Sequence, residues 1–477
     1  MGLTFAVPRW LVVVNVLLGT LTVSLNNSSL NPALPAFMEA FEIGPLLATW
    51  IVAAFMVSMG MTMPLTSFLS QRMGRKSLYL WGVALFVCGS LLGALANSIA
   101  LVIAARVVQG IASGLMIPLS LAIIFSVYAK GERGRVTGLW GAAVMLAPAL
   151  GPLCGSLMLE WFSWRSLFLM NVPIGLLALI LGVGVLPASE ASERKPFDLA
   201  GYLLIATGIG LLMIAVGRLR HAEALTDPLN LGMLLAAILC LVAFVRLELN
   251  RTSPLLNLRI FALRGYRLSV IIAVVQSVGM FECLVLLPLL VQVVMGYSAI
   301  WTGLSLLCTA MFASLFGHLG GKWLDRHGPR GVVLWGLLLT GGATLGLGML
   351  GAGASIGVVF FLMMVRGAGL GLSYIPITTA GLDALPEPMV TQGAAMNNIS
   401  RRLVSSLAIV VASLWLEFRL TAETGSGVVS MASSGAISEV FMATGILILL
   451  ALPCAWRFPV HASDEPAEAL PSALEHR

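Results

Sequence analysis

The feature that most constrains this chain is a series of apolar runs, each long enough to cross a lipid bilayer as a helix. About 20 apolar residues span the roughly 30 Å of hydrocarbon. With 59% hydrophobic and 10% charged residues, the composition excludes a soluble globular protein, in which about one quarter of residues are charged. We therefore predict an all-α, multi-pass membrane protein with fourteen transmembrane helices, at 10–35, 46–69, 78–96, 99–127, 136–159, 166–186, 199–217, 229–246, 268–294, 301–320, 332–351, 356–382, 393–418 and 438–457.

The basic residues predict how these helices are oriented. The net charge of +6 comes from Arg and Lys in short loops, and basic loops mark the cytoplasmic side of a membrane. These loops share a side with both termini and with Arg401 and Arg402, which we place at the start of the thirteenth run. The opposite side holds Arg165, Arg218, Arg220 and Arg419. Both termini are therefore expected in the cytoplasm, and nucleic-acid binding is not needed to explain the charge.

The chain repeats itself at an offset of 254 residues. This shift aligns the basic turn Gln71–Lys76 with Asp325–Arg330, and each turn separates two long apolar runs. The six apolar runs of the first half match the last six runs of the chain. The two runs between them, at 199–217 and 229–246, are therefore an insertion. Two related bundles with a binding site between them near the midplane are typical of secondary transporters.

Both turns resemble the Gly-x-Leu-x-Asp-Arg-x-Gly-Arg-Arg segment of the major facilitator superfamily. The first copy departs from it at Ser67 and Gln71, whereas the second keeps the glycine, aspartate and arginine positions. The resemblance implies a gating role for these loops. The residues concerned are Arg72, Gly74, Arg75, Asp325, Arg326 and Gly328.

Further segments resemble the fourteen-helix drug:proton antiporter branch, the EmrB/QacA-type exporters. They include Ser163–Gly175, Phe197–Gly201, Pro254–Leu258 and Gly393–Ser406. The expected organisation is a major facilitator fold with an N-terminal six-helix bundle at 1–190, two inserted helices at 191–250 and a C-terminal six-helix bundle at 251–460. Residues 461–477 read as a disordered cytoplasmic tail.

Helix 1 carries a polar cluster in the segment Leu25–Pro35. Three asparagines and two serines within a spanning helix need partners or water, so we expect the cluster to line the substrate cavity. The family has an aspartate where this chain has Asn26, and asparagine does not titrate. The residues predicted to line the cavity are Asn26, Asn27, Asn31, Gln276, Tyr374 and Asn398.

Three charged residues, Arg106, Glu282 and Arg366, lie deep in predicted helices, where a charge is costly. Arg106 matches the superfamily's helix-4 motif, which implies coupling to proton movement. Glu282 is the acid near a helix midpoint and is expected to carry the proton. The alternatives are that Arg106 is a strut bonded to facing carbonyls and that Glu282 pairs structurally with a buried arginine. For Arg366 the strut interpretation is favoured.

Helix 5 contains a segment similar to the antiporter motif Gly-x-x-x-Gly-Pro-x-x-Gly-Gly, with Gly151, Pro152 and Gly155 in place. In the family this segment is associated with exporters. From the residues alone, small side chains four apart also fit a plain packing seam between helices, so both interpretations stay open.

These features predict a proton-coupled exporter of amphipathic small molecules in the cell inner membrane, of the multidrug-efflux type. One alternative is a dedicated exporter of a single metabolite such as a siderophore, and another is a transporter-like membrane sensor. No catalytic constellation or metal-ligand spacing is apparent, so neither enzymatic activity nor a cofactor or metal is expected. The expected partners are the small-molecule substrate, protons and the lipid bilayer. A periplasmic adaptor protein is a further candidate.

Overall fold

The computed structural model describes residues 8–128, 150–187, 198–218, 227–251, 256, 258–351, 353–386, 389–423 and 429–458, which are helical apart from short turns. Thirteen helices in these segments are long and apolar enough to cross a membrane. They confirm thirteen of the fourteen predicted spans. The remaining one, 136–159, lies partly outside the described residues, and its described portion continues as a helix over 150–161.

The chain forms two compact units, which are described separately below. Unit 1 comprises Met1–Pro196 and Ser298–Leu307, and unit 2 comprises Phe197–Tyr297 and Cys308–Arg477. The helices of unit 1 are α1 (Arg9–Ser29), η1 (Asn31–Ala33), α2 (Leu34–Phe41), α3 (Pro45–Met73), α4 (Arg75–Ala94), α5 (Ile99–Val127), residues 150–161, α7 (Ser166–Leu169) and α8 (Asn171–Val185).

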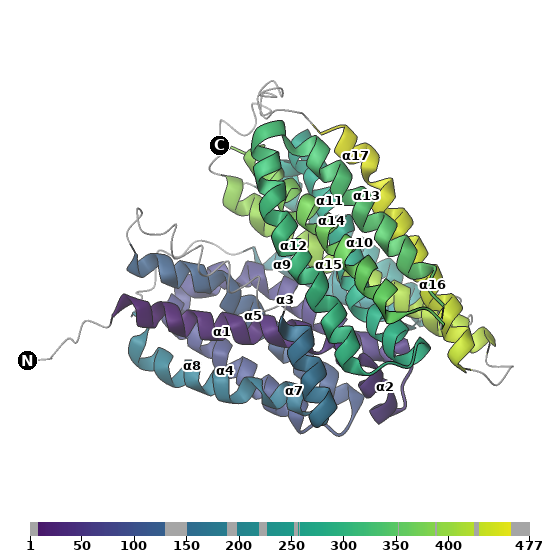
Figure 1. Cartoon of the computed structure of the whole chain (residues 1–477). Coiled ribbons are helices and arrows are strands. Elements are labelled where there is room, and N and C mark those ends of the chain that lie inside the picture. Colours follow the sequence, from purple (N-terminus) through teal and green to yellow (C-terminus); the bar gives the residue numbers. More distant parts are fainter. Residues whose placement is uncertain are drawn as a thin grey trace, which may run out of the picture. The chain divides into compact units, whose positions relative to one another are not determined.

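Unit 2 contains the two inserted helices and most of the second half of the chain. Helix α12 contributes its first residues to unit 1 and the rest to unit 2. The helices are α9 (Leu199–Arg218), α10 (Pro228–Asn250), η4 (Leu258–Ala262), α11 (Arg264–Pro288), η5 (Leu289–Val294), α12 (Ala299–His327), α13 (Pro329–Gly348), α14 (Ile356–Asp383), α15 (Val390–Glu423), α16 (Val429–Leu450) and α17 (Leu452–Trp456). Figure 1 shows α13, α14 and α16 of this unit running alongside one another.

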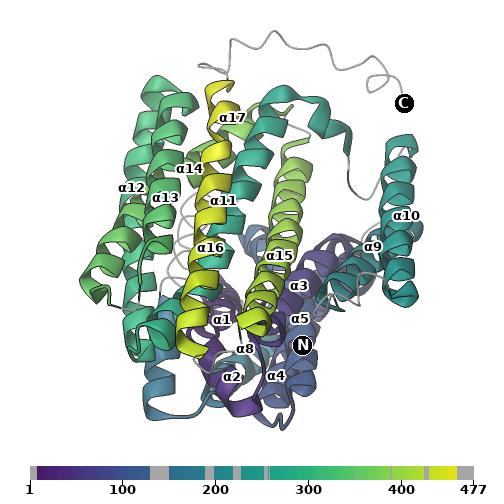
Figure 2. The same ribbon diagram turned by 90° about the vertical axis from the view of Figure 1, so that its right-hand side faces the viewer.

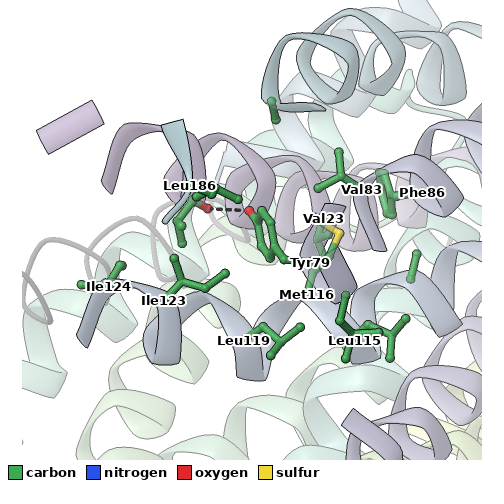
Figure 3. Close-up of a cluster of buried hydrophobic side chains, with 14 of the residues drawn as sticks. Val23, Tyr79, Val83, Phe86, Leu115, Met116, Leu119, Ile123, Ile124 and Leu186 are labelled. Atoms are coloured by element: carbon green, nitrogen blue, oxygen red, sulfur yellow. Dashed lines mark hydrogen bonds between the residues drawn. The ribbon is translucent and has the colours of Figure 1, made fainter. Parts of the chain in front are cut away.

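The core of unit 1 forms where α1, α4, α5 and α8 pack together. Figure 3 shows Val23, Tyr79 and Met116 meeting from three of these helices. Tyr79 is fully buried, and its hydroxyl donates a hydrogen bond to the Val16 carbonyl at 3.4 Å. A buried tyrosine needs such a partner, so this contact fixes α4 against α1 while the ring fills the core.

The two repeated turns have the same backbone conformation. Gly74 follows α3 with φ 80° and ψ 150°, and Gly328 follows α12 with φ 74° and ψ 176°. This region of φ and ψ is essentially restricted to glycine. Both copies therefore need a glycine at this position, because a single residue separates the two helices and must adopt this conformation.

The inserted helices α9 and α10 pack against each other at the edge of unit 2 (Figure 2). Their outer faces expose leucines and isoleucines such as Leu203, Leu235 and Ile238, as expected for surfaces that face lipid. On the inner side, Phe244 of α10 packs with Met396 and Ile399 of α15. The insertion thus packs against the helix that carries Arg401 and Arg402, which are described below.

The structure corrects the position of Arg401 and Arg402. We expected them at the start of a helix, beside the membrane surface, but α15 begins at Val390. At 1.5 Å per residue, Arg401 lies about 17 Å along the helix axis, inside the candidate span Gln392–Arg419. The predicted run at 393–418 already placed both arginines eight and nine residues inside the helix, so the assignment to the helix start was wrong, not the run.

Candidate functional sites

Arg106 of α5 forms a buried polar site in unit 1, with no exposed surface of its own. Its Nε donates to the Ile51 carbonyl at 2.9 Å, and its Nη1 donates to Asn26 Oδ1 at 2.6 Å and to Gln109 Oε1 at 2.9 Å. The guanidinium also lies over the Phe55 ring, 4.1 Å from its centroid. Arg106 therefore joins α1, α3 and α5.

All acceptors of this site are neutral. A hydrogen bond to a charged group contributes about 1.5–3 kcal/mol, so three such bonds offset much of the cost of burying the arginine. Gln109 extends the network by donating to Ser90 Oγ of α4 at 2.9 Å. Asn26 supplies an oxygen at the place where the family resemblance implies an aspartate, but its own Nδ2 is buried without a partner.

The other helix-1 asparagines differ from Asn26. Asn31 is almost fully buried, and its Nδ2 donates to the Ser28 carbonyl at 3.1 Å. Asn27 is half-buried. The structure brings Asn26 to Arg106 but does not join Asn27 or Asn31 to that network, and the cavity-lining role of all three stays a prediction.

Glu282 of α11 is the centre of a second buried site, which lies in unit 2. It is 7% exposed, and its Oε2 is hydrogen-bonded to the Thr444 hydroxyl of α16. The same hydroxyl lies 2.8 Å from the Val440 carbonyl. A hydroxyl has one proton but can also accept. It can therefore donate to an ionised Glu282, or donate to Val440 and accept from a protonated Glu282.

Arg366 of α14 lies near this carboxyl. Its Nη2 donates to the Gly279 carbonyl at 2.6 Å, one turn before Glu282, and its Nε has no partner. The two charges attract each other, but no ion pair among the described residues joins them. The direct partner of Glu282 is thus a hydroxyl that suits both of its protonation states.

The remaining predicted cavity residues fall into two groups in unit 2. Gln276 of α11 is fully buried, and its Nε2 is hydrogen-bonded to Ser373 Oγ of α14, while its Oε1 has no partner. Tyr374 and Asn398 meet at Arg401, whose guanidinium lies 4.8 Å from the Tyr374 ring centroid and donates to Asn398 Oδ1 at 2.5 Å. The structure therefore joins Tyr374 and Asn398 through an arginine that the cavity prediction omitted.

The antiporter segment on residues 150–161 packs closely against α1. A Cβ atom added to Gly155 would lie 2.1 Å from the Ser29 carbonyl oxygen, and one added to Gly151 would lie 1.8 Å from Ser28 Oγ. Next to Pro152, whose carbonyl accepts from the Ser156 hydroxyl at 2.7 Å, the glycines allow the two helix backbones to approach. The segment is a close-packed seam along the polar part of helix 1, which does not by itself decide between packing and export.

The predicted gating residues lie at the two repeated turns. Arg72, Arg75 and Arg326 are exposed, and the Arg72 guanidinium lies 4.6 Å from the centroid of the Phe68 ring. The side chain of Asp325 lies outside the described part of the structure. The gating role of these residues stays a prediction.

A buried acidic pair at the cytoplasmic-facing ends predicted for α9 and α10 was missed from the sequence. Asp198 caps α9 by accepting from the Gly201 N–H at 2.8 Å and pairs with Arg251 Nη1 at 2.6 Å. Glu248 is 1% exposed and accepts from the Leu256 N–H at 2.9 Å. Asp198 stands before a small-residue helix start, a capping signal, but nothing in the sequence pairs it with Glu248.

Comparisons with known proteins agree with this architecture. The family profile described as "Major Facilitator Superfamily" matches residues 16–409. The chain is 27% identical over 464 residues to the "Uncharacterized MFS-type transporter YcnB" of Bacillus subtilis, covering 97% of each chain. It is 26% identical over 408 residues to "Multidrug export protein EmrB" of Escherichia coli, covering 83% of this chain and 78% of the relative.

Among solved structures, the fold is similar to the D-xylose–proton symporter, with a TM-score of 0.67 and 16% sequence identity. The match covers 94% of this chain and 98% of the symporter.

Proposed function

Because the chain belongs to the Major Facilitator Superfamily, and is thus a membrane transporter rather than an enzyme, we propose that it exports amphipathic small molecules in exchange for protons. Relatives named for multidrug export or resistance support the export direction. The proton coupling rests on the chain's own residues, since helix 1 has Asn26 in place of the family's aspartate.

The observation that carries the coupling is Glu282 and its hydroxyl partner. A carboxyl with 7% exposure in the interior of a spanning helix is expensive when charged, yet no ion pair among the described residues includes this one. Thr444 can stabilise either protonation state by reversing its hydrogen bond. Glu282 is therefore a carboxyl that can take up a proton from the outside and release it inside without losing its partner.

Antiport follows if proton and cargo favour different conformations of the same transporter. A ligand shifts such an equilibrium only by its differential affinity for the two states. Protonated Glu282 would favour the state that returns to the cytoplasmic side, and cargo binding would favour release of the proton. Arg106 would then be a fixed strut in unit 1, close to the polar helix-1 segment.

We place the protein in the cell inner membrane, with both termini in the cytoplasm. This orientation rests on the distribution of Arg and Lys. Moving Arg401 and Arg402 into a span removes two charges from the cytoplasmic side but leaves the asymmetry of the loops unchanged. A reporter that is active only in the cytoplasm should be active after Ser472 and inactive after His221, and the reverse pattern would refute this orientation.

The coupling test uses purified transporter in liposomes with an imposed pH gradient and a fluorescent amphipathic substrate. Glu282→Gln keeps the size of the side chain but cannot ionise, so gradient-driven transport should fall to the level of protein-free vesicles while substrate binding persists. Glu439→Gln on α16 is the matched control, because Glu439 pairs with Arg419 and is half-exposed. Full gradient-driven transport by Glu282→Gln would end the coupling proposal.

The same assay separates the two alternatives. A dedicated exporter of one metabolite would leave unrelated amphipathic substrates untouched while a single cellular compound accumulates in a knockout. A membrane sensor would move no substrate under any gradient.

A further inference from the structure

Arg401 and Arg402 are two consecutive arginines inside a candidate spanning helix, and three of their nitrogens are buried without a hydrogen-bond partner. Arg401 Nε has no partner, nor have Nε and Nη1 of Arg402. None of the ion pairs in the described part of the chain includes either residue. Arginine keeps its charge in proteins, so two positive charges lie next to each other in α15, and no acid among the described residues pairs with either of them.

Two other arginines of unit 2 do form ion pairs with acids. Arg419, also on α15, contacts Glu439 at 2.8 Å, and Arg251 contacts Asp198 at 2.6 Å. Arg366 lies in the field of Glu282. Within the described part of the chain, the side-chain contacts of Arg401 are to neutral groups, the Tyr374 ring and the Asn398 side chain.

The pair belongs to a polar stripe on α15. Asn398, Arg401, Arg402 and Ser405 follow at spacings of three and four residues, which places them on one helix face. Ser405 is fully buried, and its hydroxyl has no partner. The acceptor oxygen of Asn398 is already occupied by Arg401. One turn before Arg401, the Asn397 Oδ1 is a buried acceptor without a partner. The unused groups of the stripe itself are N–H and O–H donors, and an anionic oxygen would satisfy several of these donors at once.

Resting on the proposed export function, we propose that Arg401 and Arg402 bind the acidic group of the exported molecule, which is an amphipathic anion with a carboxylate or sulfonate. Arginine presents forked donors that match the two or three oxygens of such a group. Tyr374 adds an aromatic surface beside the charge, on which the apolar part of the same molecule can pack.

This assignment also agrees with the energetics of antiport. Exchange of an outgoing anion for an incoming proton moves two charges in the direction favoured by an inside-negative membrane potential. Exchange of a neutral molecule for a proton would move one charge. Transport of the anion should therefore depend more steeply on the membrane potential than transport of a neutral analogue.

The test measures equilibrium binding to the full-length transporter in vesicles of zwitterionic lipid. The probes are a dansyl-labelled long-chain carboxylic acid and its methyl ester, which differ mainly in charge. Wild type should bind the acid at least tenfold more tightly than the ester. Arg402→Gln should weaken acid binding at least tenfold and ester binding less than twofold, Arg402→Lys should retain part of the preference, and Arg419→Gln should match wild type.

Several results would overturn the proposal. Equal wild-type affinities would show that the pair does not select anions, and an equal loss for both probes in Arg402→Gln would show a structural role. Loss of wild-type acid binding when phosphatidylglycerol is added, after correction for partitioning into protein-free vesicles, would assign the site to a lipid headgroup. Gradient-driven transport of the acid in the same vesicles tests the exporter function separately, because binding is measured without a gradient.

Discussion

Substitutions of Asn26 should show how unit 1 stabilises the buried charge of Arg106. Arg106 Nη1 has two hydrogens, and they are used by Asn26 Oδ1 and Gln109 Oε1. Asn26→Leu removes one acceptor, which costs about 1.5–3 kcal/mol for a bond to a charged donor. It also removes the unpartnered Nδ2, whose burial costs about 1–3 kcal/mol. The two terms largely cancel, so we expect a net loss of up to about 1 kcal/mol.

Asn26→Asp should act in the opposite direction. The acceptor oxygen remains, the unpartnered Nδ2 disappears, and a negative charge is placed beside a guanidinium that has only neutral partners. A buried charge without its counter-ion is less stable by about 3–5 kcal/mol than the intact pair. Since part of this cost is already met by three hydrogen bonds, we expect a gain of about 1–3 kcal/mol.

The assay is thermal unfolding of the purified protein in detergent at neutral pH. For a folding unit of 150–250 residues, 1 kcal/mol corresponds to about 2–4 °C in Tm. Asn26→Leu should lower Tm by up to about that amount, and Asn26→Asp should raise it. Asn27→Leu is the control, because Asn27 is half-buried outside the Arg106 network. A Tm for Asn26→Asp at or below wild type would refute the view that Arg106 lacks a counter-charge.

Three further predictions concern close contacts. Gly328→Ala should lower stability by about 1–3 kcal/mol, because φ 74° with ψ 176° strains any residue with a Cβ. The control Gly321→Ala should not lower stability, because no atom lies within 4 Å of the new Cβ. Equal Tm values for the two variants in thermal unfolding would contradict this. Gly155→Ala should reduce the yield of folded protein, measured by size-exclusion chromatography, because its Cβ would meet the α1 backbone at 2.1 Å. Arg251→Gln should cost about 1–3 kcal/mol in thermal unfolding by leaving buried Asp198 without its ion pair, and an unchanged Tm would show that the pair contributes little.

The spans were predictable because lipid leaves a backbone few choices. A chain crossing hydrocarbon must satisfy its hydrogen bonds within the segment, so long apolar runs become helices. Helix ends were less predictable, since hydrophobicity marks only the part in lipid. The run at 301–320 belongs to a helix that continues to His327, because its last two turns lie beyond the apolar stretch yet keep helical hydrogen bonds.

The site residues were predictable by type but not by partner. A buried charge is conspicuous in an apolar run, and this identified Arg106 and Glu282. Which side chain satisfies each charge depends on helix rotation and packing, which a single sequence does not specify. Thr444 lies 162 residues from Glu282, and a threonine in a spanning helix usually bonds to its own backbone. Arg401 and Arg402 were assigned to the membrane surface because they are basic, although the predicted run at 393–418 already placed them eight and nine residues inside the helix.

The buried charges of the two units have different partners. This difference is relevant to how an exporter without the helix-1 acid could still use protons. Arg106 is held by neutral oxygens, so no group in direct contact with it changes charge, and unit 1 can keep one electrostatic state throughout a transport cycle. Glu282 has a hydroxyl partner that accommodates both protonation states, and Arg366 lies near enough to attract its ionised form. A proton site needs two states of similar stability, and among these groups Glu282 meets that condition. Replacement of the helix-1 aspartate by Asn26 therefore does not require that proton coupling was lost, because a titratable group with a suitable partner is present in the other half of the chain.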